Sequence, residues 1–175
     1  GLGNKFLSHI REVEVIVHVV RLFEDSNVIH VSDKINPADD IQTVESELML
    51  ADLATLFKQK EPKGTLASKE ATFAWNTFQK VKTELDKGVP IRQQILDDDE
   101  LASLKPLNLL TSKPVIYVFN VSENQLQNKT EMEAKIKSIV SQSWSKVGQT
   151  NSTSSNQFHY IYLCPKLEPD VVALD

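Results

Sequence analysis

Three short segments of almost continuous apolar character constrain the fold of this chain more than any other feature. They span residues 13–20, 114–119 and 158–163, and valine, isoleucine and aromatic residues dominate them. A half-buried strand alternates apolar and polar residues, whereas a continuous apolar run indicates a strand covered on both faces in a parallel sheet. We therefore expect an α/β fold. Residues 4–12 predict a helix, with Asn4 as its N-cap, that leads into the first strand.

About ninety residues separate the first and second strands, and most of them have helical patterning. One helix is predicted from Asn36, as N-cap, to about Lys58, because Pro37 and two aspartates suit its first turn. A second helix follows from Ser68 and ends at Gly88. The short turn between the two helices predicts an antiparallel hairpin, and we interpret the apolar stripes of both as its packed seam.

Two shorter segments complete the predicted organisation. Residues 131–144 predict a helix between the last two strands, which gives a strand–helix–strand unit. The acidic run at residues 97–100 is interpreted as the start of a short helix, because acidic side chains stabilise a helix N-terminus. Adjacent residues point in different directions, so this run is not predicted to bind a metal.

Composition excludes several classes of protein. The chain has 19 Lys and Arg against 24 Asp and Glu and no basic run, so a dedicated DNA-binding surface is not expected. No apolar segment is long enough to cross a bilayer, and no signal sequence is evident. The single cysteine, Cys164, rules out an internal disulfide and a thiolate zinc cluster. The chain has only five glycines, and they form neither the GxxxxGK[ST] nor the GxGxxG pattern of a phosphate-binding loop.

Polar residues follow the second and third strands, where open α/β sheets bind ligands. The segment after the second strand contains Asn120, which offers a donor and an acceptor, and Glu123, which offers an acceptor. The third strand is followed by residues 164–168. Any α/β protein has polar loops in this position, so the pattern indicates a ligand-binding edge without identifying the ligand.

Three parts of the chain resemble segments of the YchF, or Obg-like ATPase, family of P-loop NTPases, in order and in spacing. The first is GLGNKFL at residues 1–7, followed by Ile10, Arg11 and the run VHVVR at residues 17–21. The second is HVSDKINPADDI at residues 30–41, followed by residues 47–48 and 50–53, and the third is LLTSKP at residues 109–114. The resemblance implies a nucleotide-binding G domain, formed by residues 1–35 and 106–175. An inserted helical hairpin, or coiled-coil, domain at residues 36–105 interrupts it.

The resemblance also implies a nucleotide base site at Asn120, Val121, Glu123, Cys164 and Pro165. Guanine-specific relatives carry Asn-Lys-x-Asp where this chain has Asn-x-x-Glu, and the longer Glu123 cannot take the place of the aspartate that accepts from guanine. ATP is therefore expected in preference to GTP, with Val121 covering one face of the purine. Pro165 replaces a small residue and removes a backbone N–H. That departure agrees either with discrimination against GTP or with loss of nucleotide binding.

His30 is the catalytic residue that the resemblance implies, because it would orient the attacking water for which ordinary GTPases use a glutamine. The alternative is a hydrogen-bonded structural histidine. By the same resemblance, Gly1, Gly3 and Asn4 form the tail of a mobile switch. The phosphate loop and the Mg²⁺ ligands would precede Gly1, and a TGS domain would follow Asp175. We therefore expect this chain to be part of a longer protein and to be inactive alone.

The implied function is that of a cytoplasmic, translation-associated ATPase that binds ATP with Mg²⁺ and has the ribosome or a translation-linked protein as its partner. This chain would supply the base-recognition and helical parts. One alternative is a non-enzymatic interaction module that acts through the hairpin. Another is a degenerate NTPase that binds nucleotide without hydrolysing it. DNA and membranes are not expected as partners, and an organellar location stays open.

Overall fold

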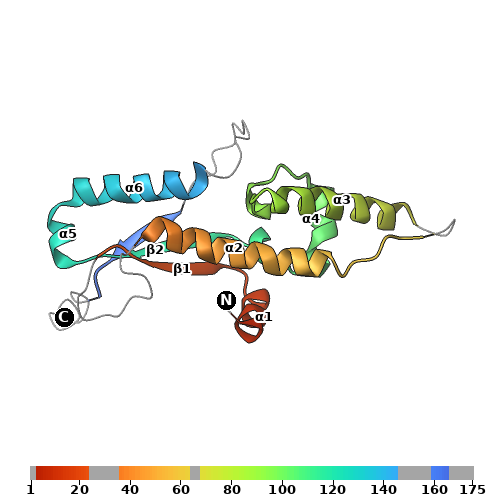
Figure 1. The fold of residues 1–175 in the computed structure, drawn as a ribbon, viewed down its shortest axis with the longest axis horizontal. Helices are drawn as coiled ribbons and strands as arrows, with labels where there is room; N and C mark the ends of the chain where they lie inside the picture. Colours follow the sequence, from red (N-terminus) through yellow and green to blue (C-terminus); the bar gives the residue numbers. More distant parts are fainter. Residues whose placement is uncertain (1–2, 24–35, 64–67, 146–158, 166–175) are drawn as a thin grey trace. The chain divides into compact units, whose positions relative to one another are not determined.

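The computed structural model describes residues 3–23, 36–63, 68–145 and 159–165 (Figure 1). These ranges contain both helices and strands, as expected for an α/β fold. In chain order, the elements are α1 (Asn4–Glu12), β1 (Ile16–Arg21), α2 (Pro37–Leu56), α3 (Lys69–Asp86), η1 (Ile91–Gln93), α4 (Asp98–Leu104), η2 (Lys105–Leu107), η3 (Leu110–Ser112), β2 (Val115–Asn120), α5 (Glu123–Gln127), α6 (Lys129–Ser145) and β3 (Tyr160–Leu163), where η denotes a 3₁₀ helix. None of the described helices is both long and apolar enough to span a membrane.

The chain divides into two compact units. Within the described ranges, residues 3–16, 44–63 and 68–114 form the helical unit, and residues 17–23, 36–43, 115–145 and 159–165 form the sheet unit. The first turns of α2 belong to the sheet unit and its remainder to the helical unit.

The sheet has the strand order β1-β2-β3 in the described part of the chain. β2 and β3 pair in parallel, with Asn120 opposite Leu163. Leu22 N donates to Asn120 O at 2.9 Å, and Ile16 N donates to Pro114 O at 3.0 Å. Residue numbers thus increase in the same sense along β1 and β2, so these strands are also parallel. In a parallel ladder, an N–H bonds to the carbonyl of the residue that precedes its own partner. The partner of Leu22 is therefore Val121, and Arg21 lies opposite Asn120.

The expectation that every strand is covered on both faces is wrong for β1 and for β3, in which Ile161 is 54% exposed. Tyr117 and Phe119 of β2 are buried, whereas Val17 and Val19 of β1 are 59% and 62% exposed. β1 lies at the edge of the described sheet, and its alternate valines point away from the elements that pack on the other face. The strand also begins at Ile16, three residues later than the apolar run predicts.

The predicted helix signals have mixed outcomes. Asn36 accepts from Ala38 N at 3.2 Å, and Ser68 accepts from Ala71 N at 3.1 Å, so both predicted caps are confirmed. Asn4 was expected to cap α1, which is wrong: Gly3 is the N-cap and Asn4 is the first helical residue. Gly3 has a φ of 78°, a conformation that glycine adopts without the strain another residue would incur.

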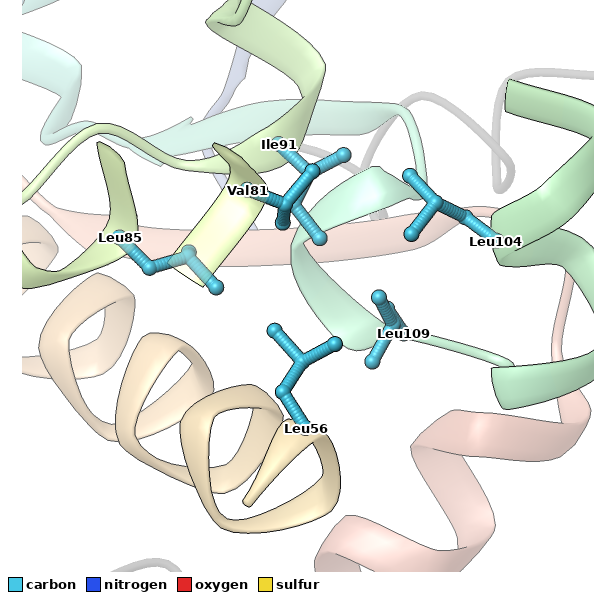
Figure 2. Packing of buried hydrophobic residues seen from close by; sticks show 6 residues of the cluster. All are labelled: Leu56, Val81, Leu85, Ile91, Leu104 and Leu109. Carbon is cyan, nitrogen blue, oxygen red and sulfur yellow. The ribbon is translucent and has the colours of Figure 1, made fainter. Parts of the chain in front are cut away.

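The core of the helical unit is not a simple seam between two helices (Figure 2). α2 contributes Leu56, and α3 contributes Val81 and Leu85. The other members come from the segment that follows α3, so this segment packs into the hairpin rather than passing beside it. The complete buried cluster is Leu56, Val81, Leu85, Ile91, Leu104 and Leu109.

Candidate functional site

The two parallel strands β2 and β3 bring four of the predicted base-site residues to one edge of the sheet. Asn120 ends β2 and Val121 follows it, while Cys164 and Pro165 come directly after β3. Val121 N donates to Leu163 O at 2.9 Å, which fixes the two strand ends against each other. The sequence therefore places these residues together because the carboxyl ends of parallel strands meet at one edge.

The loop after β2 is held by a reciprocal cap at the start of α5. Ser122 Oγ accepts from Gln125 N at 3.3 Å, and Ser122 N donates to Gln125 Oε1 at 2.9 Å. The Gln125 side chain also donates from Nε2 to Leu22 O at 3.0 Å, which ties the loop to the end of β1. Glu123 lies in the first turn of α5 and is exposed.

The other predicted residues differ in their surroundings. Val121 is only 1% exposed, and Cys164 is a buried free thiol, whereas Pro165 is exposed. His30 and Gly1 lie outside the described residues, while Gly3 and Asn4 begin α1 in the helical unit.

The end of β1 adds Arg21, which belongs to the family-like run at residues 17–21 but was not predicted as a site residue. Nη1 of Arg21 is buried without a hydrogen-bond partner, and so is Oδ1 of Asn120, which lies opposite it. Buried polar atoms are nearly always hydrogen-bonded, so two such atoms at one strand end make this edge of the sheet a candidate binding site. The available signal was that Arg21 is the charged residue that ends the apolar run of β1.

A shallow pocket of about 180 Å³ lies between α5 and α6 in the sheet unit. Its volume is below the roughly 300–1,000 Å³ that is typical of small-molecule sites, so it does not enclose a nucleotide by itself. The residues that line it are Asn124, Gln125, Asn128, Glu131, Met132 and Lys135.

The described residues do not fit a resident metal ion. Across residues 3–23, 36–63, 68–145 and 159–165, no three His, Cys, Asp or Glu side chains converge. The acidic run is a helix start, as interpreted from the sequence, because Asp97 Oδ1 accepts from Glu100 N at 2.7 Å and Asp97 N donates to Glu100 Oε2 at 2.9 Å. Lys80 Nζ then bonds both oxygens of Glu100, at 2.7 and 2.9 Å.

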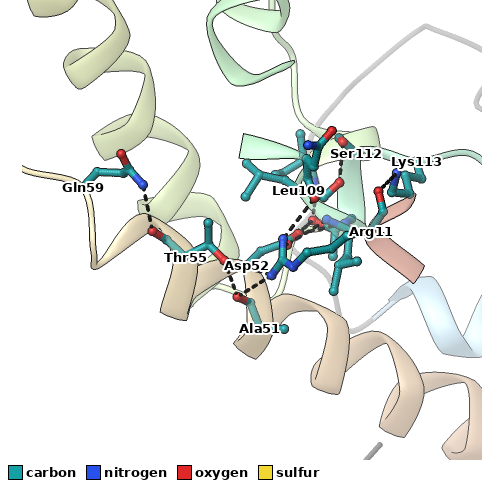
Figure 3. A network of polar contacts seen from close by, with 12 residues as sticks. Arg11, Ala51, Asp52, Thr55, Gln59, Leu109, Ser112 and Lys113 are labelled. Atoms are coloured by element: carbon teal, nitrogen blue, oxygen red, sulfur yellow. Dashed lines mark hydrogen bonds and ion pairs between the residues drawn. The ribbon is translucent and has the colours of Figure 1, made fainter. Parts of the chain in front are cut away.

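A second polar cluster, centred on Asp52, lies in the helical unit (Figure 3). Asp52 is completely buried in α2, and its Oδ1 accepts from Leu110 N at 2.7 Å. Its Oδ2 accepts from Thr111 N and from Thr111 Oγ1, both at 2.8 Å. Asp52 therefore caps η3 from another helix, because Leu109 at the N-cap position of η3 makes no side-chain cap.

Arg11 connects α1 to this cluster. Its Nη2 donates to Thr55 Oγ1 at 2.9 Å and to Ala51 O at 3.3 Å, and its Nη1 donates to Asn108 O at 3.0 Å. Nη1 also lies 3.9 Å from Asp52 Oδ1. Because donors and acceptors are matched throughout, we interpret this cluster as structural.

The chain is similar along its whole length to curated bacterial proteins described as "Ribosome-binding ATPase YchF". It is 38% identical over 180 aligned residues to the protein of Bacillus subtilis (strain 168), covering 100% of the chain and 46% of that protein. With the protein of Escherichia coli O157:H7 it shares 37% identity over 180 residues, covering 100% of the chain and 45% of that protein. No protein-family model matches the sequence.

A solved structure gives the same assignment from the fold. The "Structure of the Schizosaccharomyces pombe YchF GTPase" matches with a TM-score of 0.78 and 30% identity, covering 99% of this chain and 46% of that chain. The chain thus spans about half the length of the relatives that it matches. Because sequence and fold agree over that whole span, the chain belongs to the YchF family.

Proposed function

We propose that this chain is the base-recognition and helical part of a ribosome-associated nucleotide hydrolase. The observation that carries the proposal is the side-chain oxygen of Asn120, which is buried without a donor at the carboxyl end of a parallel sheet. Open α/β sheets bind ligands at this edge. The names of the relatives supply the activity and the partner, since they are described as a ribosome-binding ATPase and as a GTPase.

We further propose that the preferred nucleotide is ATP. Glu123 begins α5, and the Ser122–Gln125 cap fixes the backbone at that point. A glutamate held there reaches one methylene further than the aspartate of a guanine-specific motif, so the ring N–H and amine of guanine would meet it at the wrong distance. Val121, Cys164 and the exposed Pro165 would form the surroundings of the base.

Mg²⁺ is proposed as the companion ion of the nucleotide, because it neutralises phosphate charge in reactions of this class. No described residue is given a role in holding it. Ribosomes are the proposed partner, and the cytoplasm is the proposed location. Gly1, Gly3 and Asn4 are proposed to form the end of a mobile switch, with Asn4 as the first residue of α1.

The test compares ATP and GTP affinity in the complete protein that contains this chain, before and after Asn120→Ala. We expect ATP to bind more tightly than GTP, and the substitution to weaken ATP binding at least ten-fold. Asn124→Ala, which changes an exposed asparagine of α5, is the matched control. Unchanged ATP affinity in Asn120→Ala would overturn the nucleotide site and favour a non-enzymatic interaction module.

His30 is proposed to orient the attacking water. His30→Ala in the complete protein should lower kcat by one to two orders of magnitude and change ATP affinity little, since the imidazole would act on water rather than on the base. His159→Ala is the control, because His159 is exposed and lies outside the motif. Turnover equal to that of the control would remove His30 from the mechanism and favour a protein that binds nucleotide without hydrolysing it.

A further inference from the structure

Two neighbouring residues at the carboxyl end of the sheet each carry a buried polar atom without a partner. Arg21 ends β1 and has an unpartnered Nη1, and Asn120 ends β2 and has an unpartnered Oδ1. The strand register places them opposite each other on neighbouring strands, which lie about 4.8 Å apart in a sheet. Both side chains therefore lie on the same face of the sheet. One is a charged donor and the other is a neutral acceptor.

The pair stands apart from the other buried side-chain atoms of the described ranges that make no hydrogen bond. Five buried side-chain atoms in the described ranges lack a hydrogen bond. Two of them, Glu45 Oε2 and Arg92 Nη2, are paired as ions with each other. A third, Gln94 Oε1, is isolated in the helical unit. The remaining two are Arg21 and Asn120, so the deficit is concentrated at one strand end.

The backbone around this pair is already engaged and does not relieve it. Leu22 N donates to Asn120 O at 2.9 Å, and Leu22 O accepts from Gln125 Nε2 at 3.0 Å. Val121 N donates to Leu163 O at 2.9 Å. An incoming group that accepts from the arginine and donates to the asparagine would satisfy both atoms.

We infer that Arg21 is a second hydrogen-bonding residue of the base site and that, together with Asn120, it binds the edge of an adenine. This inference rests on the proposed function and adds to it a residue that the base-recognition motif does not contain. Asn120 Oδ1 accepts from the exocyclic amine, and Arg21 Nη1 donates to the adjacent ring nitrogen.

The chemistry of the two purines gives this pair a preference. Adenine presents an amine donor beside a ring-nitrogen acceptor, which complements an acceptor beside a donor. Guanine presents two acceptors along its major-groove edge, so its carbonyl oxygen would face Asn120 Oδ1. Arg21 therefore selects for an accepting ring nitrogen, and Asn120 selects for a donating exocyclic group.

The experiment measures ATP affinity in the complete protein for Arg21→Met, which keeps the apolar stem and removes the donor. The expected loss is about ten-fold or more, because hydrogen bonds from a charged group are among the stronger ones. Lys137→Met is the matched control, since it removes one positive charge from an exposed site on α6 in the same unit. Arg21→Lys, which keeps the charge and one donor, should lose less affinity than Arg21→Met.

Base analogues test the contact first in the unmodified protein, so this measurement does not require a variant to fold, and Arg21→Met then assigns the contact to the arginine. 1-Deaza-ATP and 7-deaza-ATP each replace one ring nitrogen by C–H. The unmodified protein should bind one of them about ten-fold less tightly than ATP, and Arg21→Met should bind that analogue and ATP equally. Two analogues that bind the unmodified protein as well as ATP does would overturn the inference.

The outcomes separate this inference from the proposed function. If Asn120→Ala does not weaken ATP binding, the proposed base site itself is wrong. If Asn120→Ala weakens binding while Arg21→Met behaves like Lys137→Met, the base site stands and Arg21 has no part in it.

Discussion

Two groups of buried polar side chains, one in each unit, are satisfied to very different degrees. Both oxygens of Asp52 accept hydrogen bonds, from Leu110 and Thr111, at 2.7 to 2.8 Å. Arg21 and Asn120 each keep a buried polar atom without a partner. An unmade buried hydrogen bond costs about 1–3 kcal/mol, so two such atoms on neighbouring strands call for a partner other than the protein, either water or a ligand. Complete satisfaction is typical of a structural cluster, and the two unpartnered atoms at one strand end are the basis of the proposed binding site.

The largest effect expected from this contrast is that of Asp52→Ala. The substitution leaves two backbone N–H groups and one hydroxyl buried without their acceptor, and it should lower the free energy of unfolding by about 3–5 kcal/mol. Urea unfolding of the complete protein, followed by helical circular dichroism, measures the change. Asp86→Ala, at the exposed end of α3, should stay within about 0.5 kcal/mol of the original protein. A loss below 1 kcal/mol for Asp52→Ala would show that the cluster is not structural.

A smaller loss is expected for Arg11→Ala. This arginine donates to three acceptors on α2 and on the segment before η3, but its side chain is 27% exposed, so water can replace part of what is lost. The free energy of unfolding should fall by about 1–2 kcal/mol. Arg11→Lys should recover little of it, because one ammonium cannot span the positions that the planar guanidinium reaches. Full recovery by lysine would mean that charge alone, rather than geometry, holds α1.

Much of the fold could be predicted from the sequence because the signals are local. The apolar runs gave the strands, and Asn36, Pro37 and Ser68 marked the helix starts correctly. The exposure of Val17 and Val19 could not be predicted, since it depends on which strand lies at the edge of the described sheet. When every residue of a strand is apolar, the sequence does not indicate which face of the strand is buried.

The candidate site was predictable only in part, for a similar reason. The motif pointed to Asn120 and Glu123, which lie close together in the chain. Arg21 is brought beside Asn120 by a strand register that joins positions 99 residues apart, and Asp52 meets Thr111 across 59 residues. Contacts between residues so far apart in the sequence leave no periodic pattern. Local sequence patterns therefore identify the loop after β2 but not the distant residues that contact one another in the fold.

The pH dependence of stability tests the cluster around Asp52 through the protonation of its carboxyl group. Burial raises the pKa of Asp52 above its ordinary value of 3.8, while hydrogen bonds from Thr111 and Leu110 and the charge of Arg11 oppose that shift. A raised pKa means that the folded protein keeps a proton which the unfolded chain has lost. The stability gained from this difference is fully present below pH 3.8, and it is lost as the pH rises through the raised pKa of the folded state.

The measurement is the free energy of unfolding across that pH window for the original protein and for Asp52→Asn. The original protein should lose stability relative to the variant as the pH rises, because the variant cannot titrate at this position. The difference between the two curves cancels the carboxylates that they share. Curves that stay parallel would mean that Asp52 has the same pKa in the folded and unfolded states.

The smallest change in stability is expected for Asn120→Ala, which should have a large effect on ATP binding. Asn120→Ala removes a buried acceptor that bonds nothing in the fold, so its free energy of unfolding should stay within about 0.5 kcal/mol of the original or rise slightly. Urea unfolding without nucleotide measures this change, and Asn124→Ala again provides the comparison. A loss of several kcal/mol would place Asn120 in the same class as Asp52. The contrast between the two clusters would then disappear, and weakened ATP binding by the variant could be explained by a damaged fold. An unchanged stability combined with weakened ATP binding would instead assign the unpartnered oxygen to the ligand, and it would make the neighbouring Arg21 the next donor to test.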